Sequence, residues 1–303
     1  MQRLYACSID RQANPVGTRK QLVEEIRRTY RLYLYQLVSL MEVGYYVYEL
    51  QKIKAEKYVP TIEDKTFSVK LGENSFIQAL QESNELERLV DEFKVSSMVS
   101  QDTTKKLFQK LALRDEYKAY LLEVEGKEFD RGIIRVIFKK LMLKDDLFLS
   151  AIDEQFPSWE DDKNTIINMV IGTINEYFKQ DEPTIDGVLR TLDWDDANGF
   201  VRDLFDKASE IDQKLHDYID PVLQNWEADR INPVDLILIK MALTELMYFD
   251  QIPVKVSLNE YIEISKVYST PKSKEFINGV VDTLMKQLKK EGLIVKRGAG
   301  LKE

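Results

Sequence analysis

Few side chains in this sequence are of the types that catalyse reactions. The 303 residues include one histidine, His216, and one cysteine, Cys7. A histidine base or a cysteine nucleophile needs an oriented partner, and the sequence identifies none for either residue. One cysteine cannot build a zinc site by itself, and no glycine-rich phosphate loop is present. We therefore expect a non-enzymatic protein with no catalytic residues, no metal and no cofactor.

The segment from Lys272 to Gly279, Lys-Ser-Lys-Glu-Phe-Ile-Asn-Gly, could instead bind a nucleic acid. Asn278 and Gly279 are poor residues for the middle of a helix, where glycine costs about 1 kcal/mol relative to alanine. Glycine also lets another backbone or a ligand approach closely. An asparagine amide near Lys272 and Lys274 could donate hydrogen bonds to an RNA backbone or base edge. These residues are therefore candidates for RNA binding.

Phe276 in the same segment has two interpretations. With Val280 and Leu284 it forms an ordinary apolar stripe, which predicts a core residue. Beside Asn278 and Gly279 it could instead lie on an open surface and stack on a base. Truncation to alanine distinguishes them, because a core phenylalanine contributes about 3–5 kcal/mol of stability. Its position alone leaves both open.

The overall charge limits what this protein can bind. Its net charge is −9, with 52 acidic and 43 basic residues. The phosphate backbone would be repelled by most of such a surface, so any RNA contact needs a local basic patch or a basic partner. The longest apolar segment, residues 32–47, is interrupted by polar residues and is shorter than a membrane span. The lone cysteine and the lack of a signal sequence suggest a reducing cytoplasm.

Apolar residues recur at helical spacing along most of the chain, which predicts an all-α fold. Asn232 and Pro233 form a helix start, and Gly292 fits a helix end. No segment alternates apolar and polar residues in the manner of a strand. The expected helices cover residues 1–10, 18–50, 74–93, 103–122, 126–155, 164–179, 184–191, 200–226 and 233–249.

Two shorter helices are expected between residues 252 and 281. Ser257 with Glu260 resembles a capping box and predicts the start of the first. Thr270 followed by Pro271 predicts the N-cap and first turn of the second.

Six tyrosines in the helix expected over residues 18–50 form another candidate site. Such rings could stack on RNA bases, but tyrosines at helical spacing are more often core or interface residues. They are Tyr30, Tyr33, Tyr35, Tyr45, Tyr46 and Tyr48.

Short motifs in the C-terminal third resemble the NusB family of transcription antitermination proteins. The resemblance runs from about residue 199 to 288, and residues 2–6 are weakly similar to the end of the family's first helix. The motifs are Phe200-Val201-Arg202-Asp203, Ala242-Leu243-Thr244-Glu245-Leu246, Pro253, Lys255-Val256, Asn259-Glu260 and Phe276-Ile277-Asn278-Gly279-Val280.

This resemblance implies a NusB-like bundle of two helical subdomains. Members of the family bind boxA RNA of nascent ribosomal transcripts with the ribosomal protein NusE, within an RNA polymerase antitermination complex. The resemblance implies that Tyr5, Phe276 and Asn278 face RNA. It places a second set of residues on the NusE-binding face, namely Leu223, Asp229, Asp235 and Lys240. For Asp235, in a helix first turn, plain helix stabilisation is the alternative role.

Two features differ from the family's usual pattern. The arginine-rich run expected at the start of the first helix is missing, which leaves open a shortened start or weak RNA binding. A large helical insertion also interrupts the family's core, and its role is not readable. The expected division is residues 1–59 for N-terminal core helices, 60–196 for the insertion, 197–292 for the C-terminal subdomain and 293–303 for a basic tail.

The sequence therefore leads to a primary and an alternative function. The primary expectation is a cytoplasmic, non-enzymatic antitermination factor that acts on boxA-type RNA together with NusE. The alternative is a NusB-fold structural or protein-interaction module with little RNA affinity of its own.

Overall fold

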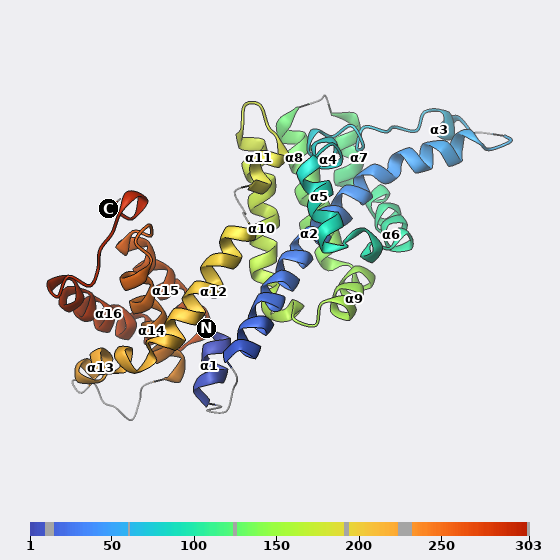
Figure 1. The fold of residues 1–303 in the computed structure, drawn as a ribbon. Helices are drawn as coiled ribbons and strands as arrows, with labels where there is room; N and C mark the ends of the chain where they lie inside the picture. The colour runs from blue at the N-terminus through green and yellow to red at the C-terminus, as the bar shows by residue number, and fades with distance from the viewer. Residues whose placement is uncertain (10–14, 60, 124–125, 191–193, 224–231, 302–303) are drawn as a thin grey trace. The chain divides into compact units, whose positions relative to one another are not determined.

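The computed structural model describes residues 1–9, 15–59, 61–123, 126–190, 194–223 and 232–301. Helices are the regular elements of these ranges, and no strand occurs in them (Figure 1). The prediction of an all-α fold is thereby confirmed. Among the described helices, none combines the length and the apolar character that crossing a membrane requires.

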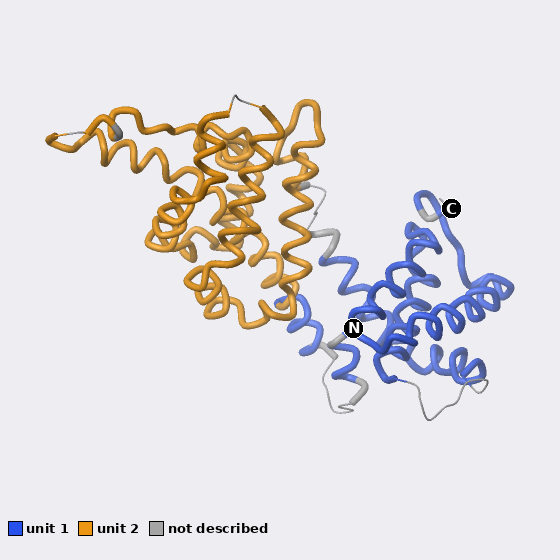
Figure 2. The backbone as a smooth tube through the Cα atoms, turned by 180° about the vertical axis from the view of Figure 1, so that it is seen from behind, with its two compact units in different colours: residues 1–24, 195–303 blue, residues 25–194 orange. Residues whose placement is uncertain are grey.

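The chain forms two compact units (Figure 2). One unit contains residues 1–24 and 195–303, and the other contains residues 25–194. Each unit has its own cluster of buried apolar side chains. The second unit thus holds most of the expected insertion together with residues 25–59, which the resemblance assigns to the NusB-like core. That assignment of the N-terminal residues stays a prediction.

The first unit is built around one central helix. Helix α14 (Pro233–Tyr248) packs against α1 (Gln2–Ile9), α13 (Asp212–Leu223), α15 (Val254–Tyr268) and α16 (Ser273–Lys290). Most of its side chains are buried, and Leu238, Ile239 and Leu243 are fully inaccessible. The predicted start is confirmed, because the Asn232 side chain accepts a hydrogen bond from the Val234 N–H and Pro233 occupies the first turn.

The C-terminal basic tail packs against the end of α14. The Lys296 ammonium donates to the carbonyl oxygens of Phe249 (2.8 Å) and Glu245 (3.4 Å), and burial lowers the pKa of Lys296. These carbonyls also accept backbone hydrogen bonds from the N–H groups of Phe249 and Ile252, so Lys296 adds a second donor to each. Gly292 follows α16 with a φ of 70°, so the predicted glycine at this helix end is confirmed.

Both predicted starts of the last two helices are wrong by a few residues. Helix α15 begins at Val254, and the Ser257 N–H already donates to the Pro253 carbonyl, so Ser257 lies inside the helix. Helix α16 begins at Ser273 rather than after Thr270. There the hydroxyl of Ser273 accepts a hydrogen bond from the Thr270 N–H (3.2 Å), which fixes the turn before the helix.

The single helix expected over residues 200–226 is also wrong. Helix α12 (Trp194–Glu210) ends one residue before a turn at Ile211, and α13 begins at Asp212. The Lys240 ammonium on α14 lies 2.5 Å from the Asp212 carboxylate. This tertiary contact holds the start of α13 against α14, and periodicity along the chain does not reveal it.

In the second unit, helices surround the long helix α2 (Pro15–Ala55), which begins in the first unit. Tyr33, Leu34 and Leu37 of α2 are fully buried in the core of the second unit. The surrounding helices are α4 (Ser75–Gln81), α5 (Asn84–Phe93), α6 (Gln101–Ala112), α7 (Asp115–Leu122), α8 (Lys127–Val136), α9 (Asp146–Gln155), α10 (Trp159–Lys179) and α11 (Ile185–Arg190).

Three helices expected in this unit are each interrupted, so their predicted lengths are wrong. The helix expected over 74–93 divides where the Ser83 hydroxyl accepts a bond from the Leu86 N–H and starts α5. In the helix expected over 126–155, α8 is followed by a π-helix at residues 137–141, and Asp145 then caps a separate helix, α9. That expected over 103–122 divides between α6 and α7. Side chains that cap a helix compete with its continuation.

The tyrosines of α2 mainly belong to the core, as the more common interpretation predicts. Tyr30, Tyr33, Tyr35 and Tyr46 are buried, and the Tyr33 hydroxyl lies 2.7 Å from the Thr173 hydroxyl. Tyr45 remains exposed.

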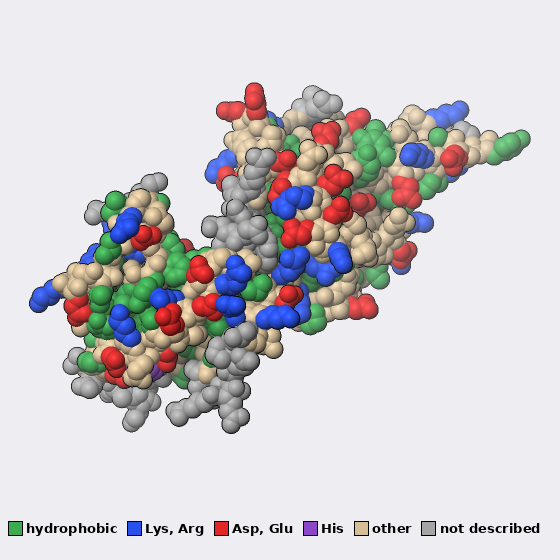
Figure 3. Space-filling model, viewed as in Figure 1, with side chains coloured by type: hydrophobic (Ala, Val, Ile, Leu, Met, Phe, Trp, Pro, Cys, Tyr) green, Lys and Arg blue, Asp and Glu red, His purple; other side chains and the backbone are tan. Residues whose placement is uncertain are grey.

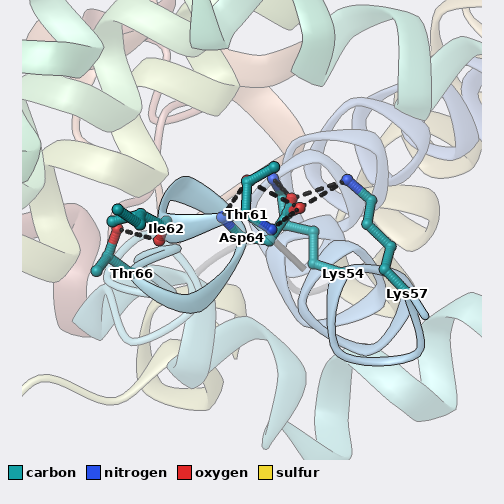
Figure 4. A network of polar contacts seen from close by, with 6 residues as sticks. All are labelled: Lys54, Lys57, Thr61, Ile62, Asp64 and Thr66. Atoms are coloured by element: carbon teal, nitrogen blue, oxygen red, sulfur yellow. Dashed lines mark hydrogen bonds and ion pairs between the residues drawn. The ribbon is translucent and has the colours of Figure 1, made fainter. Parts of the chain in front are cut away.

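Beyond the core, the end of α2 and α3 (Ile62–Lys65) form an arm. Asp64 anchors it, because its carboxylate accepts hydrogen bonds from Lys54 (2.8 Å), Lys57 (2.9 Å) and the Thr61 N–H (3.1 Å), as Figure 4 shows. Apolar side chains are exposed near the tip, visible as green atoms at the far right of Figure 3. They include Tyr58, Val59 and Ile62.

Candidate functional site

The predicted RNA-binding residues of α16 lie together at the start of that helix. We call Lys272, Lys274, Phe276, Asn278 and Gly279 the α16 strip. Lys272 is the N-cap residue, and its side chain and those of Lys274 and Asn278 are exposed. Lys274 and Asn278 are four residues apart and so share a helix face. Lys274 and Asn278 can therefore meet one ligand from solvent, and Lys272 adds a further ammonium group at the helix start.

Buried neighbours fix the orientation of this strip. Ser273, Ile277 and Val280 alternate with the exposed residues and are buried in the first unit. The first-turn N–H groups of a helix and its dipole attract anions. The start of α16 therefore combines two ammonium groups with the positive end of an 18-residue helix. Glu275, also exposed in the first turn, offsets part of this charge.

Phe276 corresponds fully to neither of its two interpretations. Its side chain is half-buried and packs against the core cluster of the first unit. Part of the ring contributes to packing, and the rest is accessible. The carbonyl of Gly279 accepts a hydrogen bond from the Thr283 hydroxyl (2.9 Å).

Tyr5 lies on α1, away from the α16 strip in sequence. It is 36% exposed. Helices α1 and α16 both pack against α14. Tyr5 and the α16 strip therefore lie on two helices of the first unit that contact the same central helix.

A buried polar network lies directly beneath the start of α16. Asp235 is 4% exposed, and its two carboxylate oxygens accept hydrogen bonds from the hydroxyls of Ser269 (2.5 Å) and Ser273 (2.7 Å). The Asn232 amide also donates to the Ser269 hydroxyl (3.1 Å). The network joins the starts of α14 and α16 through the residues between α15 and α16. It therefore positions the strip, a role that the sequence did not indicate for Asp235.

The residues assigned to a partner-binding face are mostly covered. Leu223 is 8% exposed and belongs to the core of the first unit. The Lys240 side chain is 12% exposed and paired with Asp212. The Asp235 carboxylate accepts hydrogen bonds from Ser269 and Ser273. Asp229 lies outside the described residues.

Exposed carboxylates next to these residues were missed by the sequence analysis. Asp212 and Asp220 lie four residues before and after His216 on α13, and their side chains are 53% and 63% exposed. The Lys240 ammonium lies 2.9 Å from Nε2 of His216. An ammonium only donates, so Nε2 accepts and Nδ1 faces the Asp220 carboxylate at 3.3 Å. The four-residue spacing could have identified this acidic face.

Comparison with known proteins identifies relatives for the C-terminal part of the chain. Residues 179–286 match the model of the NusB family. A transcription antitermination protein NusB of Salinibacter ruber is 41% identical over 102 residues, which are 34% of this chain and 64% of that protein. One from Chloroherpeton thalassium is 37% identical over 35% of this chain and 50% of that protein. The match thus covers one half to two thirds of these two relatives.

A third relative is matched along more of its length. The transcription antitermination protein NusB of Listeria innocua is 38% identical over 100 residues, which are 33% of this chain and 78% of that protein. No solved structure matches this chain. The α16 strip lies within the segment that the family model covers. Because the chain is 38% identical to the Listeria innocua protein over 78% of that protein's length, it belongs to the NusB family.

Proposed function

We propose that this protein is a transcription antitermination factor that binds RNA through the α16 strip and Tyr5. The name shared by the relatives, transcription antitermination protein NusB, supports the process. The observation that carries the RNA site is the exposure of Lys272, Lys274 and Asn278 on a helix start within the matched segment.

The chemistry of the strip suits a single-stranded RNA. The lysines and the first-turn N–H groups would contact phosphates, and these contacts position the RNA without reading its sequence. The Asn278 amide has both a donor and an acceptor, so it can contact a base edge. The accessible part of Phe276 or Tyr5 would stack on a base. We propose boxA-type RNA of ribosomal transcripts as the ligand.

We further propose that the ribosomal protein NusE strengthens this binding within an RNA polymerase complex. A chain with a net charge of −9 repels phosphates over most of its surface, whereas a basic partner adds phosphate contacts. The exposed Asp220 carboxylate on α13 offers complementary charge for such a partner, whereas Asp212 is already paired with Lys240. Leu223, Asp235 and Lys240 would act by holding α13, α14 and α16 in place.

The net charge also favours one other function. A protein this acidic could serve mainly as a protein-interaction module of NusB fold, with little RNA affinity of its own. In that case NusE would bind this chain, but the complex would hold RNA no more tightly than NusE does alone.

A titration of labelled boxA-type RNA tests the proposed function. We expect weak, salt-sensitive binding by the protein alone and binding at least about tenfold tighter by its mixture with NusE. A scrambled RNA of equal length and NusE alone serve as controls. Equal affinity for the protein with and without NusE would contradict cooperative binding, and equal affinity for the scrambled RNA would contradict a boxA preference.

A further inference from the structure

The second unit contains a groove that the proposed RNA site does not involve. It has a volume of about 510 Å³ and is lined by α2, α4, α5 and the start of α6. Apolar side chains, including Met41, Leu80 and Val90, line part of its surface. All lining residues belong to the unit formed by residues 25–194.

The charge of this groove is mainly negative. Glu42, Glu49 and Glu87 line it, and Lys52 is its one basic residue among those described. Glu42 is half-buried and has no ion-pair or hydrogen-bond partner within the described part of the chain. Burial, and next the negative charge of Glu49, raise the pKa of Glu42. A carboxylate in this position gains most from a cation supplied by a ligand.

Aromatic rings lie beside these carboxylates. Tyr45 and Tyr48 are in contact, with ring centroids 4.8 Å apart, and Tyr45 is 40% exposed. Tyrosine rings attract cations through their faces and also form the grooves that hold proline-rich segments. Carboxylates and tyrosine rings thus line the same groove.

We propose that this groove binds a basic, proline-containing peptide segment of a partner protein. Its arginine side chains would lie against Glu42 and Glu49, and its apolar side chains against Tyr45 and Tyr48. An RNA strand is disfavoured because the same carboxylates repel phosphates. The proposal does not depend on RNA binding by the first unit.

The spacing of the two carboxylates suggests the conformation of the segment. Glu42 and Glu49 are seven residues apart on α2, which corresponds to about 10.5 Å along a helix axis. In a polyproline II segment, residues three apart point the same way and lie about 9 Å from each other. Arginines at every third position would therefore reach both carboxylates.

Calorimetry with a synthetic peptide tests this directly. The probe is acetyl-Arg-Leu-Pro-Arg-Leu-Pro-Arg-amide, titrated into the full chain. We expect saturable binding with a Kd on the order of 10–100 µM. A matched peptide with citrulline in place of arginine keeps the shape but removes the charge, and it should bind at least about tenfold more weakly. Equal binding of both peptides, or no saturation with the arginine peptide, would overturn the proposal.

Variants of the protein locate the site. Glu42→Gln should weaken binding of the arginine peptide about tenfold. Glu24→Gln removes the same charge from an exposed position on α2 outside the groove and should leave the affinity unchanged. Glu42→Gln should not lower the Tm, because an unpaired, half-buried charge is removed. Equal affinities for the two variants would contradict the assignment.

Two variants of Tyr45 test the aromatic part of the groove. Tyr45→Ala should weaken peptide binding about fivefold, whereas Tyr45→Phe keeps the ring and should bind like the unaltered protein. Unchanged binding by Tyr45→Ala would remove this ring from the proposed site.

Discussion

Glu245 and Tyr261 form a hydrogen bond inside the core of the first unit. Both residues are buried, and the Tyr261 hydroxyl donates to the Glu245 carboxylate at 2.7 Å. Burial, followed by the negative charge of Glu245, raises the pKa of the Tyr261 hydroxyl. We expect Tyr261→Phe to lower the free energy of unfolding by about 1–3 kcal/mol, because it leaves a buried carboxylate oxygen without its donor. Denaturant unfolding measures this, and an unchanged midpoint would contradict it.

Asp64 provides a second test at the scale of single residues. Its hydrogen bonds from Lys54 and Lys57 lower the pKa of the Asp64 carboxyl below the usual aspartate range. A depressed pKa means that these contacts stabilise the arm above the unfolded-state pKa, about 3.9. The stabilisation is lost as the pH falls through the folded-state pKa. An NMR titration of the Asp64 carboxyl should show a midpoint well below the ordinary aspartate value, and a midpoint near 3.9 would contradict the described contacts.

At the scale of elements, the network around Asp235 links the starts of α14 and α16. Asp235→Asn replaces one accepting oxygen by an NH₂ group, so Ser269 and Ser273 can no longer both donate to this side chain. We expect a loss of about 1–3 kcal/mol of stability and weaker RNA binding through displacement of the α16 strip. Thermal melts and RNA titrations measure the two effects, with Asp217→Asn on the surface of α13 as the control. Unchanged stability would refute the positioning role.

The expected insertion gives another prediction about elements. Leu111 on α6 and Ile137 in the π-helix are fully buried in the core of the second unit. We therefore expect the amides around both residues to resist hydrogen exchange as well as those of α14 do. Exchange within seconds throughout residues 60–190 would show that this segment is not a packed unit.

The sequence predicted the kind of element better than the limits of the elements. Apolar periodicity correctly indicated helices, and Asn232 with Pro233 correctly marked the start of α14. Ser83 and Asp145 are equally good cap residues, yet they lie within long apolar patterns that concealed the interruptions. At the candidate site, residue types identified the α16 strip. They could not show that Asp235 is covered, because Ser269 and Ser273 are more than thirty residues away in sequence.

At the scale of the whole molecule, the two units offer different surfaces. The first carries lysines on the exposed start of α16, and the second carries an acidic, aromatic groove. The protein as a whole has a net charge of −9, so the lysines at the start of α16 form a local basic surface on an acidic protein. RNA binding by this protein should therefore depend strongly on those few lysines and on salt.

The most direct test compares two double variants on the same helix. Lys272→Ala with Lys274→Ala removes charge from the α16 strip, and Lys289→Ala with Lys290→Ala removes equal charge from the exposed last turn. Affinity for boxA-type RNA is measured with each variant at several salt concentrations in the presence of NusE. The first pair of substitutions should weaken RNA binding at least about tenfold. It should also reduce the slope of log K against log salt concentration by about 1.4, because two lysine–phosphate contacts are lost. The second pair should change neither the affinity nor the slope. Equal effects from both pairs would contradict an RNA site at the start of α16.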